Sequence, residues 1–119
     1  MTSYKPGDVV EVPFPFIDLP VRKRRPALVL SSEVMQREQG VVILAMITSA
    51  KRSKWNSDVS LQEWQQAGLK APSIVRWKIF TLESALIQSR RGSLTSEDKS
   101  RVSTSFQKVV GAFLLKNMG

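Results

Sequence analysis

The sequence predicts one mainly β domain, residues 1–119, that ends in a single α-helix. Short runs of β-branched, aromatic and aliphatic residues are separated by proline, glycine and serine, as in a sheet of short strands. One segment near the C-terminus instead repeats its apolar residues at helical spacing. A chain of 119 residues can bury a modest core of its own, so we expect a single domain.

The first expected strand covers residues 9–16, which are mostly β-branched or aromatic but include two prolines. Because proline cannot donate to a ladder, this strand should lie near a sheet edge or bend at a bulge. The cations at 22–25 then form an expected loop, and Pro26 opens a second strand, 26–30, that contains no polar residue. Since a residue before proline is held extended, Arg25 should present its guanidinium at the mouth of this strand.

A short helix is expected over residues 33–39, with Ser32 as its N-cap and a glycine after its last turn. The most hydrophobic window, 41–47, should be the central strand. This strand delivers Thr48 and Ser49 at its C-terminal end.

Residues 51–58 are polar and basic, include Trp55 and have no periodicity, so they are expected to form a loop. Ser60 and Glu63 have the spacing of a capping box, which predicts a short helix over 61–67.

The last third of the chain should begin with a half-exposed strand at 73–82, followed by a brief strand at 86–87 and a turn at 90–92. Thr95, with an acidic residue three positions later, marks the start of the terminal helix. The apolar stripe of this helix consists of Val102, Phe106, Val109, Val110 and Phe113.

Composition narrows the functions that the chain can have. Eighteen Lys and Arg residues against ten Asp and Glu give a net charge of +8, which favours a polyanionic partner: nucleic acid, an anionic membrane surface or an acidic protein. Cysteine and histidine are absent, which excludes disulfides, thiolate catalysis and the commonest metal ligands and general base. We therefore expect no metal and no cofactor. With no apolar leader and no apolar run long enough for a bilayer, we expect a soluble, cytoplasmic protein without membrane contact.

Several short motifs follow one another over nearly the whole chain: Gly7-Asp8, Arg24-Arg25-Pro26 before an apolar strand, Ile47-Thr48-Ser49, Ala67-Gly68-Leu69 with Pro72-Ser73, and Ile79-Phe80-Thr81-Leu82. In these residues and their order the chain resembles the MazF/PemK-like growth-inhibitor toxins. The resemblance implies an SH3-like barrel with short helices for the fold. It implies a metal-independent endoribonuclease for the activity, the toxin of a type II toxin–antitoxin pair, which cuts single-stranded mRNA by attack of the RNA 2′-hydroxyl. It also implies a homodimer and a cognate acidic antitoxin.

The resemblance assigns cleavage to Arg25 and Thr48. A guanidinium suits the stabilisation of charge on phosphorus, because it is planar, stays charged and can donate two parallel hydrogen bonds. Arginine is a poor proton acceptor, so the general base is left unassigned. Taken alone, a run of cations is more often a solvated loop, and a threonine such as Thr48 more often simply closes a strand.

Candidate RNA contacts combine cations with an aromatic ring, as single-stranded nucleic acid requires. Trp55 could instead pack in the core. Trp77 alternates with Arg76 and Lys78, so an inward tryptophan would leave the two cations on an outward basic face. The six candidates are Arg24, Ser49, Lys51, Lys54, Trp55 and Arg76.

The chain departs from many relatives directly after Arg76, where they carry an acidic residue and this chain has none before Glu83. Asp18 and Glu11 are the candidate substitutes. The departure keeps open a second function, an RNA-binding protein that has lost efficient cutting. A topoisomerase poison of the CcdB type ranks last, because the chain lacks the Trp-Gly-Ile end of that group.

Overall fold

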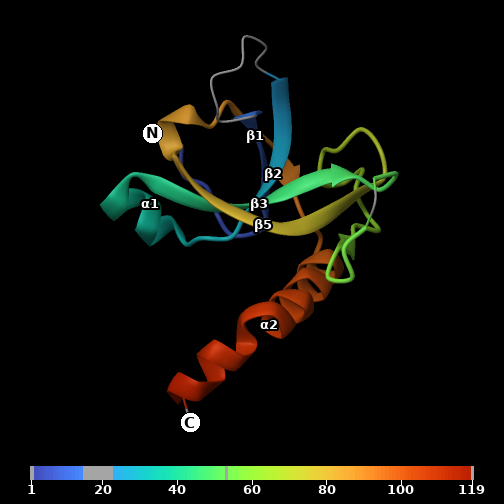
Figure 1. Ribbon diagram of the computed structural model, residues 1–119. Helices are drawn as coiled ribbons and strands as arrows, with labels where there is room; N and C mark the ends of the chain where they lie inside the picture. Colours follow the sequence, from blue (N-terminus) through green and yellow to red (C-terminus); the bar gives the residue numbers. More distant parts are fainter. Residues whose placement is uncertain (1, 15–22, 53, 119) are drawn as a thin grey trace.

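The computed structural model describes residues 2–14, 23–52 and 54–118. Six antiparallel strands form one curved sheet, a half-barrel with the strand order β4-β5-β3-β2-β1-β6, and a long helix leaves it at one end (Figure 1). The prediction of a mainly β fold with short helical pieces and a C-terminal helix is confirmed. The elements are β1 Asp8–Phe14, β2 Lys23–Val29, α1 Glu33–Gln39, β3 Val41–Ser49, β4 Val59–Ser60, β5 Ser73–Glu83, a 3₁₀ turn η1 Ser84–Leu86, β6 Ser89–Ser93 and α2 Ser96–Met118.

Strand β2 begins earlier than predicted. Its first residues pair with β1, with Val12 opposite Arg25, so the expected cationic loop is strand from Lys23 onward and Pro26 does not open it. Strand β3 pairs with β2 only at 27–29. The first half of β2 is therefore paired with β1 alone. Because no strand pairs with this half on the β3 side, the missing N–H of Pro26 costs no ladder bond there. The rest of the expected loop and the end of the first predicted strand fall within 15–22, outside the described residues.

Helix α1 and strand β3 follow the prediction. Ser32 Oγ accepts the N–H of Met35 at 3.4 Å, and Gly40 ends the helix at φ 71°, a left-handed conformation that glycine adopts without steric cost. The chain then enters β3, which extends through Thr48 and Ser49.

The helix predicted over 61–67 is wrong, because this segment forms turns. Asp98 of α2 accepts the backbone N–H of Gln62 at 3.1 Å and that of Glu63 at 2.9 Å. The N–H that Ser60 would cap is therefore already bound by a carboxylate from a distant helix. The capping box predicted from local spacing does not form.

Two further predictions in the last third are wrong. Residues 84–86 form η1 instead of leading into a strand at 86–87, and the expected turn at 90–92 lies inside β6. Strand β6 pairs with β1, whose sequence lies about eighty residues earlier. Residues 90–92 have the local sequence of a turn, but pairing with β1 holds them in a strand. Strand β5 is buried over its first five residues and mainly exposed after them, and the short strand β4 was not predicted. The described part of 51–58 is a loop, as expected.

The core lies on both faces of the sheet. Val9 belongs to the cluster that α2 covers, whereas Val10 belongs to the cluster on the opposite face, as the alternation of a strand requires. On the α2 side the ring centroid of Trp77 lies 5.1 Å from that of Phe106, so Trp77 faces inward and helps to hold the helix.

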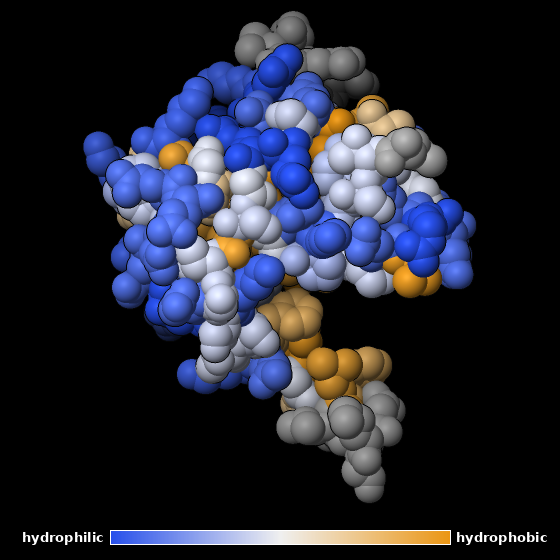
Figure 2. All heavy atoms as spheres, turned by 180° about the vertical axis from the view of Figure 1, so that it is seen from behind, coloured by the Kyte–Doolittle hydropathy of each residue, from blue (hydrophilic) through white to orange (hydrophobic). Residues whose placement is uncertain are grey.

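The terminal helix is confirmed, but only its first half packs on the sheet. Thr95 Oγ1 accepts the N–H of Asp98 at 3.3 Å and caps the first turn. Val102 is buried, whereas Val109 and Leu114 are each 46% exposed on the part of α2 that projects from the body. Apolar side chains gather on this projecting part (Figure 2). Within the described residues, no helix combines the length and apolar character needed to cross a membrane.

Candidate nucleic-acid interface

A groove of about 400 Å³ opens where β2 and β3 separate. The last pair between the two strands joins Ala27 to Met46. Two residues further along each strand come Arg25 and Thr48, which would be direct partners if the ladder continued in register. Both line the groove instead. Where the ladder stops, Arg25 and Thr48 are no longer paired across the sheet, and both side chains lie on the wall of the groove.

The groove is strongly cationic. Among its lining residues, all of which the structure describes, none is acidic. A concave surface lined by one sign of charge concentrates its field and attracts ions of the opposite sign. The six cations that line it are Arg25, Arg52, Lys70, Arg76, Lys78 and Arg91.

The candidate site residues predicted from the sequence divide into two groups. Those on the groove are Arg25, Thr48, Ser49 and Arg76. Ser49 Oγ also accepts the N–H of Lys51 at 3.2 Å, which shapes the turn after β3. Four candidates do not line the groove: Arg24, Lys51, Lys54 and Trp55 are all exposed.

Sequence reasoning missed Lys70 and Arg91. Arg91 was assigned to a turn, whereas it lies in β6 at an irregularity of the β1–β6 ladder. Its Nε donates to the carbonyl oxygen of Gly68 at 3.0 Å, and its Nη1 lies 3.6 Å from Glu11 Oε1. Lys70 directly follows the Ala67-Gly68-Leu69 motif, which was the available signal.

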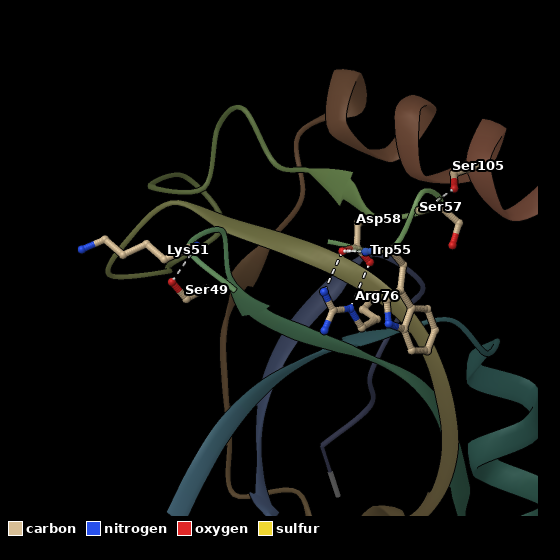
Figure 3. A network of polar contacts seen from close by, with 7 residues as sticks. All are labelled: Ser49, Lys51, Trp55, Ser57, Asp58, Arg76 and Ser105. Carbon is tan, nitrogen blue, oxygen red and sulfur yellow. Dashed lines mark hydrogen bonds and ion pairs between the residues drawn. The ribbon is translucent and has the colours of Figure 1, made fainter. Parts of the chain in front are cut away.

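Arg76 has a carboxylate partner that the sequence did not indicate. Its Nε donates to Asp58 Oδ1 at 3.1 Å and its Nη2 donates to Oδ2 at 2.8 Å, and Figure 3 shows the two groups facing each other. Arg76 is therefore buried, so the expectation of an outward basic face holds for Lys78 alone. Of the two expected acidic substitutes, Glu11 does not line the groove and Asp18 lies outside the described residues.

The ion pair keeps Asp58 charged. Burial alone would raise the pKa of Asp58, but hydrogen bonds from Arg76 and from the backbone of Trp55, with the charges of Arg76 and Lys54, bring that pKa below its ordinary value. The bond to Asp58 in turn raises the pKa of Arg76. At neutral pH the pair is a carboxylate and a guanidinium, and Asp58 is a weak proton acceptor.

Trp55 is not a core residue. It is 44% exposed, and its ring centroid lies 5.2 Å from Arg76 Cζ and 5.6 Å from Lys78 Nζ. Cations at these distances are attracted to the negative face of an aromatic ring. The indole thus lies beside two cations of the groove.

The donor set of this region is made of guanidinium, ammonium and hydroxyl groups. Across the described parts of the chain, no three carboxylates come together in a way that could hold a metal ion. Such a surface can bind phosphate and donate hydrogen bonds to it.

Residues 5–110 match the family of PemK-like, MazF-like toxins of type II toxin–antitoxin systems. Among solved structures, the fold is similar to that of a mycobacterial endoribonuclease in complex with its cognate antitoxin, with a TM-score of 0.72, 16% identity and coverage of 93% of this chain and 96% of that one. It is also similar to MazF from Deinococcus radiodurans, with a TM-score of 0.72, 18% identity and coverage of 93% and 99%. The toxin MazF-mt6 of Mycobacterium tuberculosis gives a TM-score of 0.65, 22% identity and coverage of 85% and 93%. No curated protein matches the chain significantly.

Proposed function

The chain belongs to the PemK-like, MazF-like toxins of type II toxin–antitoxin systems, and from this premise we propose that it is an endoribonuclease that cuts single-stranded mRNA without a metal ion. The observation that carries the proposal is the groove itself, which Arg25 and Thr48 line just beyond the last β2–β3 pair, together with five further cations and no carboxylate. Similarity to structures described as endoribonucleases supports it. We propose that residues 1–119 form one toxin domain.

In the proposed reaction the RNA supplies its own nucleophile. The 2′-hydroxyl attacks the adjacent phosphorus, the 5′-oxygen of the next nucleotide leaves, and a cyclic phosphate and a 5′-hydroxyl remain. Arg25 stabilises the charge that develops on the phosphoryl oxygens, and Thr48 adds a hydroxyl donor beside it. Both groups are held by strands before the substrate arrives, so little reorganisation is needed in the transition state.

RNA would reach the site along the basic surface. Ser49 and Arg76 are proposed to bind the nucleotides within the groove, whose other cations neutralise phosphates. The exposed candidates outside it, Arg24, Lys51, Lys54 and Trp55, would contact the strand on either side.

The test is cleavage of an unstructured RNA by purified protein in excess EDTA, with the fragment ends sequenced. Arg25→Ala should reduce the rate about a hundred- to a thousandfold while the protein stays folded, the typical cost of one preorganised donor. Arg37→Ala, at an exposed arginine on α1, is the matched control. Loss of cutting in EDTA, or full cutting by Arg25→Ala, would contradict the proposal.

A second function remains open because no carboxylate lines the groove and the acid nearest Arg76 is buried. In this alternative the protein binds RNA but cuts it poorly. Strong, salt-sensitive binding without fragments, at protein concentrations that saturate the RNA, would favour the alternative over the endoribonuclease.

We also propose two protein partners. An acidic antitoxin would fit the cationic groove and block Arg25; solved neighbours include a toxin with its cognate antitoxin and a MazE–MazF complex. A second copy of the chain would form a homodimer and cover apolar side chains such as Val109 and Leu114 on α2. The cytoplasm, where mRNA is translated, is the proposed compartment.

A further inference from the structure

A buried carboxylate beside the groove carries an inference about how RNA is recognised. We propose that Asp58 is a positioning residue that holds Trp55 and Arg76 as one clamp, in which the indole stacks on an unpaired base and the guanidinium binds the adjoining phosphate. The inference rests on the proposed function, because it concerns how the same groove selects single-stranded RNA. Asp58 acts through its neighbours, since its own side chain is only 2% exposed.

Three donors converge on the Asp58 carboxylate (Figure 3). Two come from Arg76, at 3.1 Å and 2.8 Å, and the third is the backbone N–H of Trp55, 2.8 Å from Oδ2. The backbone N–H of Asp58 returns a bond to the carbonyl oxygen of Trp55 at 3.1 Å. Paired bonds to a guanidinium fix its plane, and the bonds to Trp55 fix the turn that carries the indole. One carboxylate therefore sets both halves of the clamp.

The turn is also held from the side of α2. Ser105 Oγ donates to the carbonyl oxygen of Ser57 at 3.1 Å and accepts the indole N–H of Trp77 at 2.9 Å. The residue next to Asp58 is thus bonded to a helix that is itself packed on the core. This second attachment holds the turn that carries Trp55 against the folded body.

The position of Trp55 suits a stacking surface. Its ring lies over Arg76 and Lys78, and both of these cations line the groove. A base on the exposed part of the indole would therefore have its phosphate next to cations. Proteins that bind single-stranded nucleic acid use this combination of an aromatic face and a cationic track.

The test is Asp58→Asn. Asparagine keeps the shape of the side chain but turns an amide N–H toward the donors of Arg76, so the clamp loses its alignment. We expect KM for an unstructured RNA to rise about tenfold or more, the loss typical of one stacked base, with kcat changed less than about twofold. Glu97→Gln, at an exposed acid on α2, is the matched control and should leave both constants unchanged.

Binding of an RNA with 2′-O-methyl groups, which has no nucleophile, separates this inference from the proposed function. If the wild-type protein binds the methylated RNA but does not cut unmodified RNA, the proposed function fails. The clamp is then tested by binding alone, through the Kd of Asp58→Asn compared with that of wild type. Trp55→Ala should weaken binding to a similar degree, and the double variant should bind no more weakly than either single variant.

Three results would overturn the inference. They are an unchanged Kd and KM in folded Asp58→Asn, a fall in kcat at constant KM, and additive losses in the double variant. If Asp58→Asn does not fold, Trp55→Ala decides, because Trp55 is exposed and its removal opens no cavity. An unchanged Kd for Trp55→Ala would then refute the clamp.

Discussion

Replacing Asp98 by asparagine tests how the turns at 61–67 are held in place. The Asp98 carboxylate is fully buried and accepts the N–H groups of Gln62 and Glu63, and it forms an ion pair with Arg101. An amide offers one acceptor oxygen, so one N–H loses its partner, at a cost of about 1–3 kcal/mol. The partly exposed bond to Arg101 adds about 0.5–1 kcal/mol. We expect Asp98→Asn to lower the free energy of unfolding by about 1.5–4 kcal/mol.

Urea denaturation followed by tryptophan fluorescence measures this loss, with Glu97→Gln as a neighbouring control at an exposed acid. Burial alone would raise the pKa of Asp98, but bonds from Glu63, Arg101 and Gln62 lower it. A lowered pKa in the folded state stabilises the protein above the pKa of the unfolded chain, and this contribution is lost as pH falls through the folded value. The difference between wild type and variant should therefore shrink in acid. A loss below about 0.5 kcal/mol at pH 7, or an equal loss at pH 3, would refute the reasoning.

Three further predictions concern the groove and α2. Gly68→Ala should destabilise the protein in urea denaturation and weaken RNA binding, because Gly68 has φ +80° and a Cβ there would lie 2.3 Å from the carbonyl oxygen of Arg91; unchanged stability would contradict this. Lys78→Ala should reduce the slope of log K against log salt for single-stranded RNA by about 0.7, the value for one phosphate contact, and an unchanged slope would place Lys78 off the RNA path. Leu114→Ser should shift sedimentation toward monomer without changing the far-UV circular dichroism, and an unaltered mass distribution would place the dimer interface elsewhere.

Local signals in the sequence predicted the elements that depend on neighbouring residues. Ser32 and Gly40 delimit α1 through bonds within a few residues, and the stripe that starts at Val102 follows from helical spacing alone. Family resemblance singled out Arg25 and Thr48; both line the groove just beyond the end of the β2–β3 ladder, and their roles stay a prediction.

What the sequence could not predict depends on partners that are distant along the chain. Asp98 replaces Ser60 as the group that binds the turn after β4, although 38 residues separate the two acceptors. Asp58 pairs with Arg76 from a loop, and no spacing rule links a loop carboxylate to a strand guanidinium. Arg91 was hidden because its strand forms only against β1. In each case a tertiary contact decides the outcome.

The split between β2 and β3 has a consequence for how such a protein can be controlled. A slip of one residue between these strands would put Arg25 and Thr48 on opposite faces of the sheet and bury the wrong side chains at the same time. Folding of the sheet therefore brings both residues to the same groove, without any later rearrangement of the strands. Under the proposed function, a newly made chain would therefore be competent as soon as it folds, and its restraint would have to come from a molecule that occupies the groove.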